Sequence, residues 1–330
     1  MRAESASMGR NQQLWSYIKA YHWADMLAMV RNSKADPRQC ADDFAGRLVV
    51  ITGATSGIGY ATAREYASHG AELLCINRDA QKSRALCDEI EAGFGVRCRD
   101  IIADLGTLDE MHRVGRQLAE LSDPIDVLIH NAGTYLTRRA ETIDGLETVF
   151  AVNYLSSFVI TYLLRDKLAT QKRARILLVS SEAHRFAPWG LRMDDLNWEH
   201  RRYSGLRSYG SAKLAQLLSL LAFDEWFDGT GVAINAVHPG SVKTDSGKDN
   251  SQFYKWYKTN IIERNFRSTG ISADALYYLG VSGELEGTSG KFFNLTTPET
   301  PTPPALDREA AHELWKISLK LGRLEATPER

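Results

Sequence analysis

The sequence has little excess charge of either sign and no long uninterrupted hydrophobic run. Lysine and arginine number 40 against 41 acidic residues, which gives a formal net charge of -1. A nucleic-acid-binding surface needs a clear basic excess, so we expect no nucleic-acid partner. A spanning helix needs about 18 or more largely apolar residues in a row, so we also expect no transmembrane segment. The opening stretch MRAESASMGRNQ lacks the apolar core of a secretory signal, which favours a cytoplasmic location.

Cysteine is scarce, and the four cysteines do not form a ligand pattern. Cys40, Cys75, Cys87 and Cys98 show neither C-x-x-C nor any other metal-type spacing. We therefore predict no metal site and interpret these residues as reduced, mostly structural thiols.

From Arg47 onward, short apolar or β-branched runs alternate with segments of helical length. Strands that are apolar at consecutive positions are buried on both faces, as in a parallel sheet covered by helices on both sides. The pattern predicts a Rossmann-type, doubly wound α/β domain over residues 46–300 with a seven-stranded, mainly parallel sheet. The seven predicted strands lie in the stretches RLVVITG, AELLCINR, VRCRDIIADL, DVLIHNAG, RILLVSS, VAINAVHPG and GKFFNL.

The two ends of the chain do not follow this alternation. Residues 13–31, within an N-terminal extension over residues 1–45, form a helical segment with a wide apolar arc, and we expect it to pack on the body or on a second subunit. Its few basic residues make a membrane-interface role the less favoured alternative. Over residues 301–330, a proline-rich connector leads to a docked terminal helix that begins at Asp307 and places Leu314 and Trp315 on one stripe.

The most informative stretch is VVITGATSGIGYATAREYASHG, an apolar strand that runs directly into a glycine-rich turn and a small-residue helix. Glycines let the backbone turn tightly and approach a pyrophosphate, whose charge then lies at the positive end of the helix. A glycine-rich turn alone is often only a turn, but this strand and helix around it predict dinucleotide binding. The residues of the loop that we assign to this role are Gly53, Ser56, Gly57, Ile58 and Gly59.

Two further strand ends bear on the choice of cofactor. An acidic residue at the end of the second strand would favour NAD, whereas this chain has Asn77 and Arg78 there. A guanidinium fits a 2′-phosphate, so NADP(H) is favoured over NAD(H), although Arg78 could also be a solvated surface arginine. At the end of the third strand, Asp104 either contacts the adenine edge or caps the next helix, and the sequence leaves both open.

The stretch SYGSAK places Tyr209 and Lys213 four residues apart, on one face of a helix. By itself this spacing is weak evidence, because most such pairs are structural. The rest of the chain supplies the companions, in order: TGATSGIG (52–59), DL (104–105), NAG (131–133), VN (152–153), VSSEAHRF (179–186), YGSAK (209–213) and HPGSVKT (238–244).

With these motifs the chain resembles the short-chain dehydrogenase/reductase family, and within it the retinol-dehydrogenase-like and WW-domain-oxidoreductase-like branch, over roughly residues 45–325. The resemblance implies that Tyr209 exchanges a proton with the substrate oxygen and that Lys213 bonds the nicotinamide ribose and lowers the pKa of the tyrosine. It implies that Ser181 holds the substrate oxygen and that Asn153 supports a water-linked proton path to the lysine. It also implies that the dinucleotide contacts Arg78, Asp104, Leu105, Asn131, Ala132, Gly133, Tyr209, Lys213, Pro239, Gly240 and Thr244.

The chemistry that this reaction needs can be stated independently. Hydride transfer to a carbonyl develops an alkoxide, which must be stabilised and protonated as it forms. A phenol with a pKa near 10 is a poor base at neutral pH, and a nearby ammonium would bring it into range. We therefore predict a catalytic pair. Two nearby histidines are not assigned to catalysis: His184 is expected to line a loop or pocket wall, and His130 to be a packing variation.

Two stretches are expected near the substrate. The insert between Ser181 and Tyr209 brings Phe186, Trp189, Leu191 and Trp198 near the pocket mouth. A substrate lid over about 244–270 contains five aromatic residues, which suggest a lipophilic substrate but could equally be core or dimer contacts.

Together these features predict an NADP(H)-dependent oxidoreductase that interconverts a carbonyl and an alcohol on a lipophilic small molecule. By resemblance it is a homodimer or homotetramer, paired through the helix that carries Tyr209 and the helix after Asn153; the added terminal segments could cover one of those faces. The alternative is a non-catalytic dinucleotide sensor or scaffold of the same fold. A protein that only binds would not need all four of Asn153, Ser181, Tyr209 and Lys213, which argues against this alternative. A dehydratase or epimerase is disfavoured by the compact glycine spacing.

Overall fold

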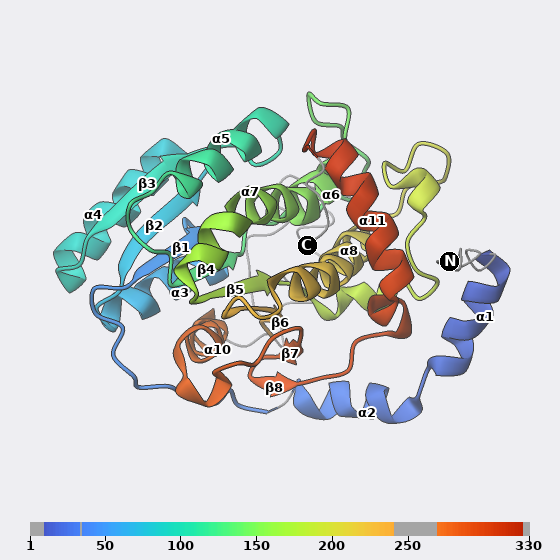
Figure 1. Ribbon diagram of the computed structural model, residues 1–330, viewed down its shortest axis with the longest axis horizontal. Helices are drawn as coiled ribbons and strands as arrows, with labels where there is room; N and C mark the ends of the chain where they lie inside the picture. Colours follow the sequence, from blue (N-terminus) through green and yellow to red (C-terminus); the bar gives the residue numbers. More distant parts are fainter. Residues whose placement is uncertain (1–9, 34, 241–268, 326–330) are drawn as a thin grey trace.

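The computed structural model describes residues 10–33, 35–240 and 269–325, which build one sheet with helices on both faces (Figure 1). The strand order is β3-β2-β1-β4-β5-β6-β7-β8. Strands β1 to β7 are parallel, and β8 pairs antiparallel with β7 at the edge. The strands are β1 (Leu48–Thr52), β2 (Glu72–Asn77), β3 (Cys98–Ile102), β4 (Val127–His130), β5 (Ala174–Val179), β6 (Val232–His238), β7 (Phe292–Asn294) and β8 (Thr297–Pro298).

The predicted doubly wound, mainly parallel sheet is confirmed, and all seven predicted strands form. The strand count is one higher than predicted because the chain turns back after β7 and adds β8. A strand of two residues that includes a proline carries no alternating pattern, so nothing in the sequence predicts it.

Two helical layers enclose the sheet. One layer consists of α3 (Gly57–Ser68), α4 (Ala80–Phe94) and α10 (Thr269–Val281), and the other of α5 (Leu108–Ala119), α7 (Ser156–Gln171) and α8 (Gly205–Phe227). Successive side chains of β1 point to opposite layers: Val49 and Ile51 join the first core, and Leu48 and Val50 join the second. This alternation explains why the strand is apolar at every position.

Between β4 and α7 the chain forms the short helix α6 (Thr148–Phe150) and a π-helical turn (Ala151–Leu155). Taken together, Thr148–Gln171 is the one described helical stretch long and apolar enough to cross a membrane, and 83% of its most apolar window is buried in the protein. Core helices of globular domains have the same composition, so this stretch is explained by its packing between α5 and α8.

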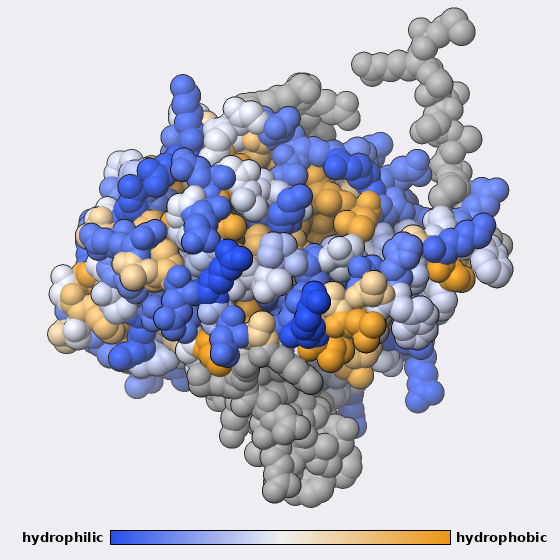
Figure 2. Space-filling view, turned by 90° about the horizontal axis from the view of Figure 1, so that it is seen from below, coloured by the Kyte–Doolittle hydropathy of each residue, from blue (hydrophilic) through white to orange (hydrophobic). Residues whose placement is uncertain are grey.

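The N-terminal extension contains two helices, α1 (Arg10–Ala20) and α2 (Trp23–Asn32), where one helical segment over residues 13–31 was predicted. The chain bends at Tyr21 and His22, where His22 has extended backbone angles. Packing on the body is confirmed for the inner face: the Tyr17 hydroxyl donates to Asp307 (2.6 Å), and the Asn32 amide donates to Glu299 (3.0 Å). The outer face leaves several large apolar side chains exposed: Trp15, Ile18, Trp23, Leu27 and Val30. Apolar residues lie in patches among polar ones on the face of the molecule seen in Figure 2.

The terminal helix α11 (Arg308–Leu321) begins as predicted, with the Asp307 carboxylate accepting a hydrogen bond from the backbone N–H of Ala310. The Trp315 ring packs edge-on against Phe158 of α7 (5.0 Å between ring centroids) and Phe223 of α8 (4.8 Å). Figure 1 shows α11 lying across these two helices. The terminal helix therefore covers part of the surface that α7 and α8 would otherwise present.

Candidate functional site

The loop between β1 and α3 has the geometry that its glycines predict. Gly53 and Gly57 adopt the left-handed backbone conformation, with φ of 72° and 58°. Gly59 has a negative φ but no room for a side chain, because an added Cβ would lie 2.2 Å from the Gly53 carbonyl oxygen and 2.5 Å from the Asn131 amide nitrogen. The left-handed backbone at Gly53 and Gly57 and the lack of space at Gly59 both favour glycine, and any other residue would require the backbone to move.

Side chains of β1 and β4 brace this loop. The Asn131 amide donates to the carbonyl oxygens of Thr52 (3.0 Å) and Gly53 (2.9 Å). The Thr52 hydroxyl accepts from the backbone N–H groups of Asn131 (3.0 Å) and Ala132 (2.9 Å). The NAG turn and the glycine loop are thus held together as one unit at the carboxyl ends of neighbouring parallel strands, where α/β sheets bind their ligands.

The end of β2 has two residues with different roles. Asn77 is buried, accepts from the Ala54 backbone N–H (2.8 Å) and donates to the Ser83 hydroxyl (2.9 Å), so it supports the glycine loop. From the sequence, Asn77 was considered only as the residue standing where an NAD-binding acid would be, and this support of the loop was not predicted. Arg78 is exposed, lines the cleft and makes no hydrogen bond or ion pair to the described residues.

The structure separates the two alternatives for Asp104. Its carboxylate accepts from the Gly106 backbone N–H (2.9 Å), which forms a local turn. The first N–H of α5, that of Leu108, is instead bound by Asp144 (2.8 Å), and Thr107 occupies the N-cap position. Asp104 therefore does not cap α5, and its exposed side chain faces the cleft.

The serine and tyrosine of the predicted catalytic group are brought together by α8 and the loop after β5. A hydrogen bond from Ser181 favours the ionised form of Tyr209, but burial outweighs it and raises the pKa of Tyr209 to about 12. Lys213 is not among the described groups that shift this pKa, so the predicted lowering by the lysine stays a prediction. The phenol is consequently protonated and can act as an acid at neutral pH.

Lys213 is buried, with its amine held by the carbonyl oxygen of Val179 (2.8 Å) and by the Gln216 side-chain oxygen (3.0 Å). Desolvation lowers the pKa of the lysine to about 7. The amine lies 5.5 Å from the centroid of the Tyr209 ring. The two groups share a helix face, as their spacing predicts.

Asn153 lies in the π-helical turn and binds backbone rather than the lysine. Its amide donates to the carbonyl oxygens of Thr134 (2.8 Å) and Val149 (2.8 Å), and its oxygen accepts from the Thr134 N–H (3.1 Å). An added Cβ on Gly133 would lie 2.6 Å from this oxygen. Asn153 therefore fixes the NAG turn, and its predicted role in a proton path stays a prediction.

Neither histidine is placed as a general base. His184 is buried, with Nδ1 2.9 Å from the Ser181 carbonyl oxygen and Nε2 accepting from the Thr302 N–H (3.2 Å), and burial lowers its pKa to about 3. His130 is buried against Thr161 (2.9 Å to the hydroxyl), which fits the predicted packing role. Both rings are neutral at physiological pH.

A buried carboxylate that the sequence analysis missed connects the helix that leads to Asn153 with the start of α8, which carries Tyr209. Glu147 accepts from the backbone N–H groups of Val149 (3.0 Å) and Phe150 (2.7 Å), which begin the helix leading to Asn153. It also accepts from the hydroxyls of Tyr203 (3.1 Å) and Ser208 (3.1 Å), and the latter directly precedes the catalytic tyrosine in the chain. The only sign of this role in the sequence is an acidic residue directly before an apolar helix.

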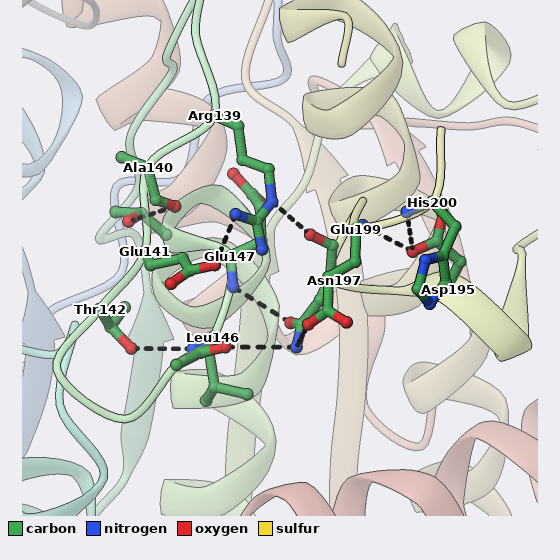
Figure 3. A network of polar contacts seen from close by, with 12 residues as sticks. Arg139, Ala140, Glu141, Thr142, Leu146, Glu147, Asp195, Asn197, Glu199 and His200 are labelled. Carbon is green, nitrogen blue, oxygen red and sulfur yellow. Dashed lines mark hydrogen bonds and ion pairs between the residues drawn. The ribbon is translucent and has the colours of Figure 1, made fainter. Parts of the chain in front are cut away.

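Figure 3 shows how the insert is fastened around this carboxylate. The Asn197 side-chain oxygen accepts from the Glu147 backbone N–H (3.1 Å), and the Asn197 carbonyl accepts from Arg139 (2.8 Å). Asp195 closes the next turn by accepting from the N–H groups of Glu199 (2.7 Å) and His200 (3.3 Å). The stretch DDLN (residues 194–197) within the insert thus holds the insert against the loop before α6.

The insert does not place its aromatic residues as predicted. None of Phe186, Trp189, Leu191 and Trp198 lines the cleft formed by the described residues. Trp198 is buried beneath the Arg201 guanidinium, 3.6 Å from the ring centroid, and Phe186 and Trp189 are half exposed. Among the described residues, Tyr135 places its ring edge-on to Tyr209 at 5.8 Å, a contact that the motif spacing alone could not reveal.

One continuous cleft of about 1100 Å³ brings most of the predicted site residues together. Gly59 lies behind the loop rather than in the lining, and Thr244 and residues 244–268 of the predicted lid lie outside the described residues. No cluster of potential metal ligands occurs in the described parts of the chain. The predicted residues that line the cleft are Gly53, Ser56, Gly57, Ile58, Arg78, Asp104, Leu105, Asn131, Ala132, Gly133, Asn153, Ser181, Tyr209, Lys213, Pro239 and Gly240.

Comparisons with known proteins agree with this geometry. Residues 47–191 match the family model for short chain dehydrogenases. The chain is 34% identical to retinol dehydrogenase 13 of Homo sapiens over 292 residues, which cover 86% of this chain and 87% of that protein. It is 32% identical to the WW domain-containing oxidoreductase of Homo sapiens over 286 residues, 84% of this chain and 69% of that protein. The crystal structure of an uncharacterised protein from Mycobacterium paratuberculosis is similar with a TM-score of 0.65 and 29% identity, covering 89% of this chain and 97% of that one.

Proposed function

We propose a specific reaction for this chain, which belongs to the short-chain dehydrogenase/reductase family of oxidoreductases and to its retinol-dehydrogenase-like branch. It interconverts a carbonyl and an alcohol on a lipophilic small molecule, with NADP(H) as the preferred cofactor. The observation that carries this proposal is the convergence of Ser181, Tyr209 and Lys213 with the glycine loop on one cleft.

The cleft residues fit a dinucleotide. The absence of a side chain at Gly59 lets the loop close tightly, and the braced turn at Gly53 leaves backbone N–H groups at the start of α3 for a pyrophosphate. The Lys213 ammonium has three N–H groups, of which the described residues accept two, so one is left for the cleft. When bound, the nicotinamide donates or accepts the hydride.

The protein's own residues handle the proton. In the reductive direction, Tyr209 gives its proton to the developing alkoxide, for which a raised pKa is no obstacle. Ser181 lies beside the phenol and can donate to the same oxygen, which stabilises the charge as it forms. In the oxidative direction, the phenol must ionise, and the buried charge of Lys213 assists that step.

The preference for NADP(H) is supported by Arg78 and its surroundings. Its guanidinium has no partner among the described residues, and it stands at the strand end where the adenosine ribose is expected. The adjacent acid, Asp79, is committed to the backbone N–H groups of Gln81 and Lys82 at the start of α4. An unpaired cation next to an occupied carboxylate favours a 2′-phosphate over a free hydroxyl.

The substrate class and assembly belong to the same proposal. Leu136, Ile143 and Val152 contribute apolar side chains to the lining of the cleft, which suits an apolar substrate. We also propose a cytoplasmic location and a homodimer. Because α11 packs on α7 and α8 through Trp315, a pair formed on that face would include α11 in its interface.

The test is a titration of the purified protein with NADPH and NADH by tryptophan quenching, followed by NADPH consumption with aromatic, steroid, retinoid and quinone carbonyls. Turnover that requires Tyr209 and tighter binding of NADPH than of NADH support the proposal. Tight NADPH binding without turnover on any carbonyl would instead favour the sensor alternative, and a preference for NADH would contradict the role given to Arg78.

A further inference from the structure

Gln216 lies one helical turn after Lys213 on α8 and belongs to none of the family motifs quoted above. Its side-chain oxygen accepts a hydrogen bond from the Lys213 amine at 3.0 Å, and the Val179 carbonyl accepts a second at 2.8 Å. Gln216 is 1% exposed and Lys213 3%. The lysine is thus held by two acceptors inside the protein.

The chemistry of the two groups fixes the orientation of the amide. An ammonium can only donate, so the amide must turn its oxygen rather than its NH₂ toward Lys213. Both acceptors are neutral, since one is an amide and the other a backbone carbonyl. They orient the ammonium without cancelling its charge.

We propose that Gln216 is a positioning residue that aims the Lys213 ammonium into the cleft and, by being neutral, preserves its positive charge for the ionisation of Tyr209. This inference rests on the proposed function. A carboxylate at the same position would hold the amine equally well but neutralise it. An apolar side chain would leave a buried N–H without an acceptor.

The surroundings of Lys213 isolate this effect. Tyr209, on the same helix, is the titratable group that faces the amine. Among the described residues, no other charged or titratable side chain of β5, of α8 or of the π-helical turn contributes to the pKa shift of Lys213, which burial alone causes. Changing the charge at position 216 therefore changes the field at the lysine with few competing contributions.

The decisive experiment titrates Lys213 directly in two size-matched variants, Gln216→Glu and Gln216→Met. Lysine ε-carbons are labelled with ¹³C, and the Lys213 signal is identified by its absence in Lys213→Met. We expect Gln216→Glu to raise the pKa of Lys213 by about one unit or more, since an opposite charge favours the ammonium, and Gln216→Met to lower it. Unchanged titration in both variants, or shifts in the same direction, would overturn the inference.

Turnover gives a second readout that a purely structural role would not produce. When Tyr209 gives up its proton in carbonyl reduction, a charged Lys213 stabilises the phenolate left behind, so the rate should fall as pH rises through the pKa of the lysine. Gln216→Glu should move this fall to higher pH by the shift seen in the titration but lower the rate on its acidic side, because the carboxylate cancels the charge that assists Tyr209, whereas Gln216→Met should move the fall to lower pH. If the unaltered protein reduces no carbonyl, the proposed function fails, while the ¹³C titration still decides the role of Gln216.

Discussion

The two ends of the cleft are built from different chemical groups. At the nucleotide end, formed by the carboxyl ends of β1, β2 and β4, the glycine loop and the NAG turn are braced by uncharged hydroxyl and amide side chains. At the catalytic end, beyond β5, Lys213 and His184 are buried and Tyr209 is half-buried, and desolvation is the largest cause of each pKa shift. In the proposed function, cofactor binding therefore depends on backbone shape, whereas catalysis depends on desolvated side chains.

The largest expected effect separates the two ends completely. Tyr209→Phe removes the hydroxyl that transfers the proton, so kcat should fall by about 10² to 10⁴, the range typical of a lost general acid. NADPH affinity should change little, because the nucleotide end is untouched. Stopped-flow turnover and fluorescence titration measure the two quantities.

The matched control is Tyr60→Phe. The Tyr60 hydroxyl, on α3, donates to Glu89 of α4 (2.7 Å), and its loss should leave kcat unchanged. A Tyr209→Phe protein that retains full activity would show that another group supplies the proton. Equal losses in both variants would mean that the tyrosine is only structural.

Gly59→Ala tests the nucleotide end. The new methyl group would lie 2.2 Å from the Gly53 carbonyl oxygen, so the loop must move. We expect the free energy of unfolding to drop by about 1 to 3 kcal/mol, as for other overpacked sites. NADPH affinity should fall with it, and urea denaturation and fluorescence titration measure both effects.

Gly93→Ala is the control for this substitution, because Gly93 lies within α4 with nothing within 4 Å of the added carbon. It should stabilise the protein by about 0.4 to 1 kcal/mol through the unfolded chain. Unchanged NADPH binding in Gly59→Ala would show that the loop does not contact the pyrophosphate.

The same comparison explains what the sequence could predict. The glycine loop and the seven long strands follow local rules, such as the conformations open to glycine and the apolar runs of buried strands, and they were predicted correctly. Contacts between distant segments have no local signature. The loop support by Asn77, the link through Glu147 and the ring beside Tyr209 supplied by Tyr135 could therefore not be foreseen.

Two predictions depended on information that only packing supplies. Lys213 was expected to lower the pKa of Tyr209, but the largest cause of the shift within the described residues is burial, which only the fold reveals. Trp198 was placed near the pocket mouth as part of the insert between Ser181 and Tyr209, whereas the fold buries it under Arg201. Sequence spacing gives proximity, and only packing gives the dielectric environment.

Arg78→Ala should have a smaller effect, confined to one cofactor. If the guanidinium holds a 2′-phosphate, its loss removes a charge-assisted contact of about 1.5 to 3 kcal/mol, so NADPH should bind about tenfold or more weakly. NADH has no phosphate there and should bind as before. Fluorescence titrations with both nucleotides measure the ratio.

The control is Arg84→Ala. Arg84 is also an exposed arginine, but it lies on α4, and its loss should change the affinity for neither nucleotide. Equal weakening of NADPH and NADH in Arg78→Ala would indicate a general electrostatic effect. No change in either would place the 2′-phosphate, or the cofactor preference itself, elsewhere.

The last expected effect is on stability alone, and it concerns a buried charge cluster behind Ser181. Glu182 is bonded to Arg185 (2.5 Å), which also reaches the buried Glu299 (2.9 Å). Burial raises the pKa of Glu182 to about 7, with Glu299 adding to the rise and Arg185 opposing it. A raised folded-state pKa favours the folded protein when the group is protonated, so this contribution is lost as pH rises from about 4.5 to 7.

Glu182→Gln removes that dependence, because an amide cannot ionise. Relative to the unaltered protein, the variant should therefore gain roughly 2 kcal/mol of unfolding free energy on going from pH 5 to pH 8. Urea denaturation at the two pH values measures this change, and the exposed Glu120→Gln should show none. If Glu182→Gln instead loses stability at pH 8, the ion pair with Arg185 outweighs the cost of burying the Glu182 carboxylate. Desolvation would then be a weaker influence at the catalytic end of the cleft than the comparison of the two ends suggests.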